Sequence, residues 1–472
     1  MSKIKIFLSY FLIVSIVIIG FTGCFRKKEP IQQVEWKDVD LVYYKMFDDE
    51  DVMAPLIADY QSNNAGVRIH YKKFEDFEEY MDTIVDELAE GEGPDIFSAQ
   101  NTWFHDNLKK LTPAPKTSVT SDVFDQAFVD VASRDLVKTD DLGQKNVYGV
   151  PLTVDTLALY YNKDHYNDRL PEIGRPAETW AELMDHVYEL TEEDDSFERF
   201  EVAGIAMGRA DNITRAVDVL YLLMLQLGTT FYSTDFSQAD FGNDLGAKEA
   251  LKFFASFSGD ENKNYSWNKY ISDSDSEEKE ITTFAKGKVS MVIGYSYMYE
   301  QILDEIKELK SKGIKTVEPS VIRVASIPQM TAEATDKRVT YANYFAETVS
   351  RTSENAEEAW KFLLYLGSKE ALQKYNEATH KPTSRRDLIE DQKLDPVYGV
   401  FVKQIGYAES FPIYNYWKYK DIFTEAIQSA VSGNMEVALK IAEAEITKLL
   451  PKINPLDAKL KDPNKNENTA QN

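Results

Sequence analysis

Residues 148–163 read YGVPLTVDTLALYYNK, and this stretch divides the sequence into two blocks. Its second half, Leu157 to Tyr161, is an almost continuous apolar run, which is typical of a buried strand. Its first half, Tyr148 to Pro151, opens the second block. The residues before and after this stretch are therefore considered separately.

Strands and helices alternate in the block before residue 148. Apolar residues recur there at the spacings of both kinds of element. This alternation predicts an α/β fold built on an open sheet with right-handed crossovers. The expected strands are Leu41–Phe47, Val67–Phe74 and Asp95–Ser98, and the expected helices are Asp51–Tyr60 and Phe77–Leu88.

The block after residue 148 mixes strands with helices and becomes helical towards its end. Thr179 with Glu182 three residues later is a capping box, which predicts a helix from Trp180 to Leu190. Gly433-Asn434 predicts a break in the helical segment Val397–Leu450. The other expected strands are Val202–Met207, Val289–Ile293, Val321–Ile327 and Tyr341–Val349, and the other expected helices are Tyr297–Lys310 and Ala356–Leu366.

Composition excludes one class of partner. The 472 residues include 53 Lys and Arg against 79 Asp and Glu, so the formal net charge is −26. A nucleic-acid partner is not expected, because phosphate backbones require a basic face. The hydrophobic content of 43% is sufficient for a packed core, and the length suggests two or three domains.

The sequence offers little for catalysis or for holding a metal. The five histidines show no HExxH pattern or close i,i+4 pairing, and no Walker loop is present. The segment Gly294–Met298 begins like a nucleophile elbow but lacks its closing glycine. We therefore expect no catalytic residue, no metal and no cofactor, although a pair of carboxylates that hydrolyses glycosides remains an alternative.

The N-terminus has the features of an export signal. Lys3 and Lys5 precede an apolar run from Ile6 to Ile19, which is shorter than the roughly 20 residues of a spanning helix. Gly20–Cys24 follows and resembles a bacterial lipoprotein signal, in which the cysteine is lipidated after cleavage. Three cations directly after it, Arg26 to Lys28, oppose an uncleaved anchor, which is the alternative.

This interpretation assigns the two ends of the chain. Residues 1–23 are the expected signal peptide, 24–38 a tether that begins with the lipidated Cys24, and 459–472 a disordered polar tail. The protein is then held by lipid on the outer face of the cytoplasmic membrane.

Several segments, in this order, are similar to the extracellular solute-binding proteins of ABC importers, in the sugar-binding group that includes maltose-binding protein. The likeness covers residues 39–455, and the stretch 148–163 is its most specific part. The segments are Gly93–Phe97, Tyr148–Pro151, Asp155–Lys163, Thr179–Leu183, Phe284–Met291 and Ser432–Leu439.

The resemblance implies a two-lobed periplasmic-binding-protein fold of type II, whose lobes are discontinuous in sequence and joined by hinge strands. Lobe 1 would comprise residues 39–152 plus 332–405, and lobe 2 residues 153–331 plus 406–458. The crossings would lie near Val150–Val154, Ile327–Thr335 and Gly406–Tyr414. A ligand between the lobes would be enclosed by a hinge motion.

A carbohydrate ligand needs aromatic platforms beside short polar groups. Position after a strand or at a crossing selects the candidates. For Asn212 the alternative role is a helix cap, and for Asp155 it is a cap or a hinge salt bridge. The candidate ligand-binding residues are Phe47, Asp48, Asn101, Trp103, Asp155, Asn212, Tyr295, Tyr297, Asn343, Tyr414 and Trp417.

The function implied by the resemblance is a monomeric receptor without catalytic activity. It would capture a sugar or oligosaccharide and deliver it to the membrane subunits of an ABC importer. The acidic composition leaves a second hypothesis open, a cationic solute such as a polyamine or basic peptide. An enzyme acting on glycosides is the third.

Overall fold

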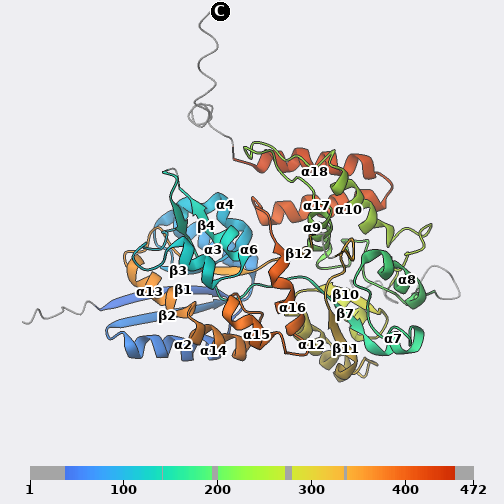
Figure 1. The fold of residues 1–472 in the computed structure, drawn as a ribbon, viewed down its shortest axis with the longest axis horizontal. Coiled ribbons are helices and arrows are strands. Elements are labelled where there is room, and N and C mark those ends of the chain that lie inside the picture. Colours follow the sequence, from blue (N-terminus) through green and yellow to red (C-terminus); the bar gives the residue numbers. More distant parts are fainter. Residues whose placement is uncertain (1–37, 141, 194–199, 272–278, 334–336, 452–472) are drawn as a thin grey trace, which may run out of the picture. The chain divides into compact units, whose positions relative to one another are not determined.

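The computed structural model describes residues 38–140, 142–193, 200–271, 279–333 and 337–451 (Figure 1). The expected signal peptide, Cys24, the tether up to residue 37 and the tail lie outside the described residues. No described helix is both long enough and apolar enough to span a membrane. All the elements below belong to the compact unit that begins at Val39.

The buried apolar side chains of the described residues form two separate cores, and each core defines a lobe. The core of lobe 1 draws on residues 41–154 and 342–408. The core of lobe 2 draws on residues 157–341 and 411–450, with Phe401 added. Each lobe is therefore assembled from two stretches that are distant in the sequence.

Lobe 1 is built on a five-stranded sheet in the described part of the chain, with the order β2-β1-β3-β13-β6. The first three strands are parallel, whereas β13 runs antiparallel to both β3 and β6. Its strands are β1 (Val39–Met46), β2 (Val67–Phe74), β3 (Ile96–Gln100), β6 (Val150–Pro151) and β13 (Phe345–Val349), beside a ribbon of β4 (Val137–Thr139) and β5 (Lys145–Val147). Its helices are α2 (Glu50–Asn63), α3 (Phe77–Glu90), α4 (Phe104–Asn107), α5 (Ser121–Ala127), α6 (Asp130–Leu136), α13 (Ala356–Leu366), α14 (Lys369–Thr379) and α15 (Ile389–Gln392).

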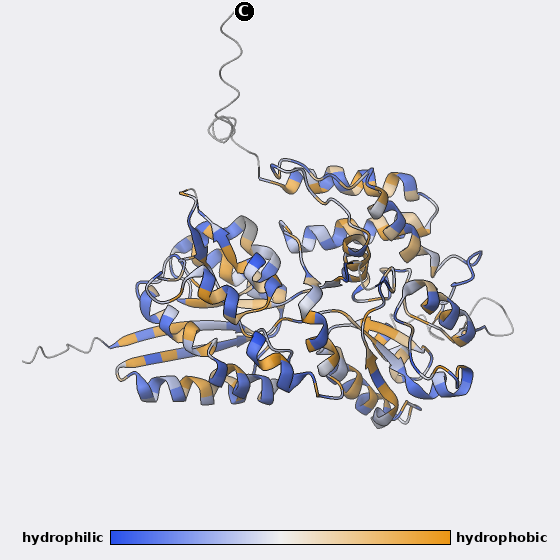
Figure 2. Cartoon of the chain, in the orientation of Figure 1, coloured by the Kyte–Doolittle hydropathy of each residue, from blue (hydrophilic) through white to orange (hydrophobic). Residues whose placement is uncertain are grey.

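Lobe 2 has a smaller, antiparallel sheet with the order β10-β7-β11. Figure 2 shows these strands as strongly apolar, in keeping with their burial. The strands are β7 (Ala158–Asn162), β10 (Met291–Gly294) and β11 (Ile322–Ala325), beside a ribbon of β8 (Glu192–Glu193) and β9 (Phe200–Val202). The helices are α7 (Lys163–Arg169), α8 (Trp180–Leu190), α9 (Ala216–Gln226), α10 (Leu245–Ser256), α11 (Glu280–Ala285), α12 (Met298–Ser311), α17 (Tyr416–Val431) and α18 (Met435–Leu449).

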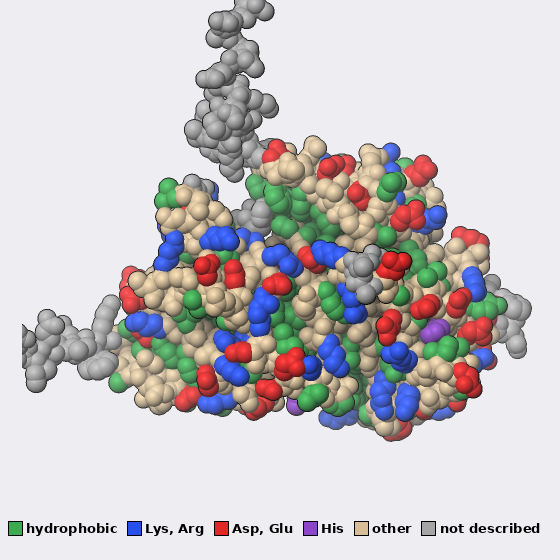
Figure 3. Space-filling view, viewed as in Figure 1, with side chains coloured by type: hydrophobic (Ala, Val, Ile, Leu, Met, Phe, Trp, Pro, Cys, Tyr) green, Lys and Arg blue, Asp and Glu red, His purple; other side chains and the backbone are tan. Residues whose placement is uncertain are grey.

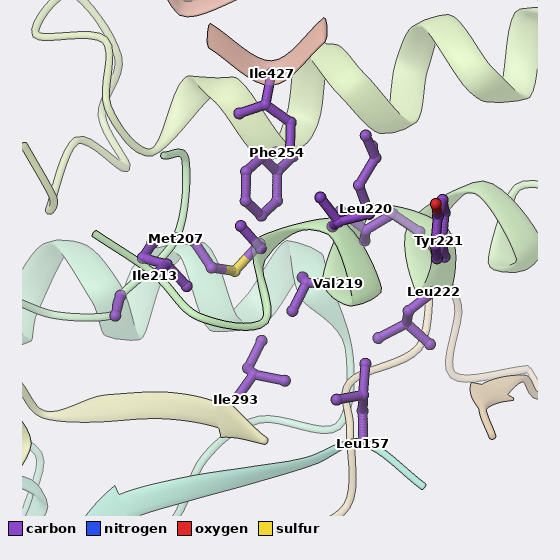
Figure 4. Close-up of a cluster of buried hydrophobic side chains, with 14 of the residues drawn as sticks. Leu157, Met207, Ile213, Val219, Leu220, Tyr221, Leu222, Phe254, Ile293 and Ile427 are labelled. Carbon is purple, nitrogen blue, oxygen red and sulfur yellow. The ribbon is translucent and has the colours of Figure 1, made fainter. Parts of the chain in front are cut away.

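Helix α9 lies at the centre of the core of lobe 2. Its residues from Ala216 to Met224 are all buried, so it is apolar on nearly every face rather than on one stripe. Figure 4 shows Leu222 directed towards Leu157, and Phe254 and Ile427 on the opposite side of the helix. The start of α9 is therefore held rigidly.

Three short crossing segments connect the lobes and lie side by side. Strand β12 (Thr340–Tyr341) pairs in parallel with β14 (Ala408–Glu409), and Thr156 forms an antiparallel bridge with Ala342. The core changes from lobe 2 to lobe 1 between Tyr341 and Ala342, later than the predicted crossing at 327–335. The crossing segments thus form a narrow backbone bridge between two large cores.

Most predicted elements are confirmed, and three differ for physical reasons. The predicted helical segment Val397–Leu450 is interrupted at 408–415, where the chain forms β14 and crosses into lobe 2. The predicted strand Tyr341–Val349 is interrupted, because the chain passes between the lobes at 342–344. Strand β9 ends at Val202, so only the first residue of the predicted strand Val202–Met207 belongs to a strand. Beyond it the chain passes close to α8: a Cβ on Gly204 would lie 2.5 Å from the carbonyl oxygen of Val187.

Gln404, the last residue of α16 (Gly399–Gln404), supports the crossing segments from within. Its buried amide oxygen accepts from the backbone N–H of Ile327 at 2.8 Å, and its Nε2 donates to the carbonyl oxygen of Leu157 at 3.1 Å. One side chain of α16 therefore satisfies backbone groups of lobe 2 at Leu157 and at Ile327.

We expect Gln404→Leu to destabilise the protein by about 3 kcal/mol, because two buried backbone groups lose their partners. Urea unfolding followed by circular dichroism measures this change. Gln373→Leu, on the exposed face of α14, is the matched control. A loss for Gln404→Leu no larger than that of the control would contradict this role.

Candidate functional site

Aromatic rings from the two lobes meet where α3 and α17 begin. Phe77 of lobe 1 contacts Tyr416 and Trp417 of lobe 2, with 5.7 Å between ring centroids in both pairs. Phe345 lies 5.6 Å from Phe77, and Phe47 lies 6.0 Å from Phe345. We call these five residues the ring cluster. Figure 3 shows hydrophobic side chains gathered below α17 and α18 on this face of the molecule.

Unusual backbone conformations position two parts of the ring cluster. Phe47 directly follows β1 with a φ of 68°, and its side chain is 49% exposed. Asn415, directly before Tyr416, has a φ of 64°, and its side chain caps α17 by accepting from the N–H of Lys418. Left-handed backbone costs free energy outside glycine and is often retained at functional sites.

A second group of side chains, around Arg215, adjoins the ring cluster in lobe 2. The guanidinium carbon of Arg215 lies 5.6 Å and 5.5 Å from the ring centroids of Tyr295 and Tyr297, which stack on each other. Arg215 also pairs with the buried Asp218 at 3.7 Å, and Tyr295 donates its hydroxyl to that carboxylate. Arg215 also lies close enough to the Tyr416 hydroxyl to lower its pKa, so the two groups of side chains adjoin each other.

The charges of this group are shifted by their surroundings. Burial alone lowers the pKa of Arg215, but the nearby Tyr297 hydroxyl and Asp218 carboxylate outweigh burial and raise it. Burial raises the pKa of Asp218, and Arg215 only partly offsets that effect. Burial also raises the pKa of Tyr416 to about 12, which keeps its hydroxyl protonated at neutral pH. The guanidinium is therefore the firmly charged group here.

The loop before α9 is anchored on both sides, and this fixes Arg215. The N–H of Thr214 donates to the buried Glu280 carboxylate at 3.0 Å. The indole N–H of Trp267 donates to Asn212 at 2.8 Å, and Asn212 donates to the carbonyl oxygen of Asn268 at 3.0 Å. The suggestion that Asn212 caps a helix is wrong, because Arg215 occupies the N-cap of α9.

The predicted aromatic residues divide between this site and the cores. Phe47, Tyr297 and Trp417 lie at the site, with Tyr295 buried directly beneath Arg215. Tyr414 is buried against the ring of Tyr232 instead. Trp103 packs against Phe97 within lobe 1 and lies below the ammonium of Lys110.

Two of the predicted polar residues are engaged inside lobe 1. The buried Asp48 carboxylate pairs with Lys45 at 3.1 Å and with Lys381, and it accepts from the Tyr375 hydroxyl at 2.6 Å. Burial raises the pKa of Asp48, but the two lysines outweigh burial and hold it well below its usual range. Asn101 donates to Asp135 at 3.0 Å. Both side chains thus stabilise lobe 1.

Asn343 and Asp155 lie at the crossing segments. Asn343 donates its backbone N–H to the carbonyl oxygen of Asp155 at 3.1 Å and accepts from the Gln100 amide at 2.9 Å. The buried Asp155 carboxylate accepts from the Ser296 hydroxyl at 2.6 Å and from the N–H groups of Ser296 and Thr156. Of its two alternative roles, a cap on the turn after β10 fits these bonds.

Sequence reasoning missed some residues at this site. Phe77 contacts lobe 2 and Phe345 packs against Phe77, while Tyr416, Lys420 and Arg215 lie on the side of lobe 2. One signal was available: Tyr416 stands in the dense aromatic segment 411–417. Among the described residues, no group of three or more His, Cys, Asp or Glu side chains is arranged to hold a metal ion.

Comparisons with known proteins agree with this architecture. The model of the family described as bacterial extracellular solute-binding protein matches residues 55–396. A putative binding protein of Brucella abortus (strain 2308) is 23% identical over 401 residues, covering 83% of this chain and 88% of the relative. A putative binding protein of Brucella suis biovar 1 (strain 1330) matches to the same extent.

Solved structures share the fold at low sequence identity. A solute-binding protein of an ABC transporter from Thermotoga lettingae, bound to α-D-tagatose, has a TM-score of 0.63 at 21% identity, covering 87% of this chain and 99% of its own. The sugar-binding protein MalE of Xanthomonas citri has a TM-score of 0.68 at 16% identity, covering 87% and 97%. These matches confirm the predicted α/β fold with two lobes.

We expect the stability contribution of Asp155 to depend on pH. Burial raises the pKa of Asp155 from 3.8 to about 6 in the folded protein, although Ser296 and Thr156 donate to it. The folded state therefore binds the proton more tightly than the unfolded state, and stability falls as pH rises between these values. Relative to Asp155→Asn, the wild type should lose about 3 kcal/mol between pH 4 and pH 7 in urea unfolding.

Ser296→Ala provides a matched test of the cause. It keeps the Asp155 carboxylate but removes the hydroxyl that favours the charged form, so the fall in stability should extend to higher pH. A difference between wild type and Asp155→Asn that is constant from pH 4 to pH 7 would contradict the assignment.

Proposed function

The chain belongs to the bacterial extracellular solute-binding proteins, and on this basis we propose that it captures a carbohydrate between its two lobes for delivery to an ABC importer. Structural relatives support the ligand class. One was solved with α-D-tagatose, and a cyclo/maltodextrin-binding protein of the same fold was solved with maltotetraose.

The observation that carries this proposal is the contact of aromatic rings across the lobes. Sugars present apolar C–H faces that pack on flat rings, and Phe77, Tyr416 and Trp417 supply such rings from both sides. The indole N–H of Trp417 is buried and has no acceptor among the residues that the structure describes. A sugar hydroxyl would satisfy that donor.

Binding and closure would then be one event. A ligand shifts the lobes only as far as its affinity differs between the open and closed arrangements. A sugar held by Phe77 on one side and by Trp417 on the other binds both lobes only when they are closed. The crossing segments Thr156, β12 and β14 would act as the hinge.

We also propose that the protein does no chemistry on its ligand. Two carboxylates beneath this site, Asp155 and Asp218, are buried and engaged with donors of the protein. Neither is free to transfer a proton to a glycosidic oxygen.

The finer localisation is also a proposal. Cys24 after a short apolar segment supports a lipid anchor that retains the protein outside the cytoplasmic membrane.

We expect Trp417→Ala to weaken carbohydrate binding by about 10- to 100-fold, because a stacking ring contributes about 1–3 kcal/mol. Isothermal titration against a panel of neutral and acidic oligosaccharides measures this. Phe77→Ala should have a similar effect from the opposite lobe. Tyr188→Ala on α8, whose ring is 54% exposed, is the control that should bind normally. The proposal would be refuted if no carbohydrate of the panel bound while another class of solute did.

We expect Cys24→Ser to release the protein from the membrane fraction into the soluble fraction, because lipidation needs the thiol. Mass spectrometry of the wild-type N-terminus should show an acylated Cys24. A Cys24→Ser protein that stays fully membrane-bound would favour the uncleaved anchor instead.

A further inference from the structure

Positive charges gather beside the ring cluster, although the whole chain carries a net charge of −26. The ammonium of Lys420, one turn into α17, lies 5.3 Å from the ring centroid of Trp417. Arg215 and Lys279 are its cationic neighbours, and burial together with the charge of Arg215 lowers the pKa of Lys420. Lys420 is therefore a half-buried cation beside Trp417, and Arg215 is the charged group that acts on it most strongly.

A nearby carboxylate pairs with Arg215, but none pairs with Lys420 in the described part of the chain. Asp218 is buried beneath the site, where it pairs with Arg215 and accepts from Tyr295. Lys420 makes no ion pair with a carboxylate in the described part of the chain; the charge of Asp218 acts on it less than that of Arg215 but more than that of Lys279, and Asp421 acts least. Among the described residues, Lys420 is thus a cation beside the rings that has no ion-pair partner.

Helix geometry adds to the positive potential. Arg215 is the N-cap of α9, and Tyr416 is the first residue of α17, so both helices begin at this site. Each helix N-terminus carries a partial positive charge and N–H groups without partners inside the helix. Together with Arg215 and Lys420, these two ends favour an anionic group.

We propose that the carbohydrate bound here is acidic and carries a carboxylate, as a uronic acid does. Lys420 and Arg215 would bind the carboxylate while the sugar ring packs on Trp417 and Tyr416. Arg215 suits this role because its planar guanidinium matches a planar carboxylate. This inference rests on the proposed function and names its substrate class.

One other role for Lys420 must be separated from this one. The first turn of α3, around Phe77, carries the exposed acidic residues Asp76, Glu78 and Glu79. If Lys420 served to pair with that turn when the lobes close, its loss would lower the affinity for neutral and for acidic ligands equally. If it binds the ligand's carboxylate, its loss affects acidic ligands alone.

The test compares trigalacturonate with its fully methyl-esterified form, which has the same rings but no charge. Isothermal titration at low ionic strength should show the acid binding about tenfold or more tightly than the ester. Lys420→Met keeps the aliphatic stem over Trp417 and should remove most of this difference, because it should weaken binding of the acid far more than binding of the ester. Lys420→Arg should retain the preference. Lys418→Met, exposed on the same helix, is the matched control.

The outcomes separate this inference from the proposed function. Equal affinity for acid and ester, or a preference that Lys420→Met leaves unchanged, would overturn the inference while carbohydrate binding stands. Failure of trigalacturonate, its ester and every neutral oligosaccharide of the panel to bind would overturn both. Circular dichroism of each variant confirms that a lost preference does not reflect misfolding.

Discussion

The backbone pairing of three short crossing segments is the constraint on which the rest of this structure depends. Thr156 pairs with Ala342, and β12 pairs with β14, while each lobe closes its own core on either side. Because the two cores are separate, neither core by itself fixes the angle between the lobes. Side chains at the bridge, above all Gln404 and Asp155, therefore determine how the crossing segments are held.

The site takes its character from where this bridge places two helix starts. Phe77 begins α3 in lobe 1, and Tyr416 begins α17 in lobe 2, so the rings meet across the boundary. Lobe 2 supplies the cations, from the start of α9 and the first turns of α17, and its buried Asp218 holds Arg215 from below. A single region thus combines apolar faces, hydrogen-bond donors and positive charge, which is the combination that an acidic sugar requires.

Burial explains why acidic residues contribute so little to this site despite their abundance. A charge that is removed from water must be paired or hydrogen-bonded. Asp48, Asp135, Asp155 and Asp218 all meet that condition within the protein, each with two or more donors or cations. The net charge of the chain is therefore a property of its outer surface, and it gives no guide to the sign of the ligand.

The sequence by itself determined the local elements and the family. Apolar spacing located β2, α8 and α13, and the Thr179 capping box and the break at Gly433-Asn434 both appear in the structure. These features depend on neighbouring residues, as do the segments that resemble the solute-binding proteins. Packing in three dimensions decided the site. It buried Asp48 and Tyr414 inside the lobes. It also placed Phe77 against Trp417, and Arg215 against the ring of Tyr297. Those contacts join residues far apart in the chain, and no local pattern records which side of a strand end or helix start will face the other lobe.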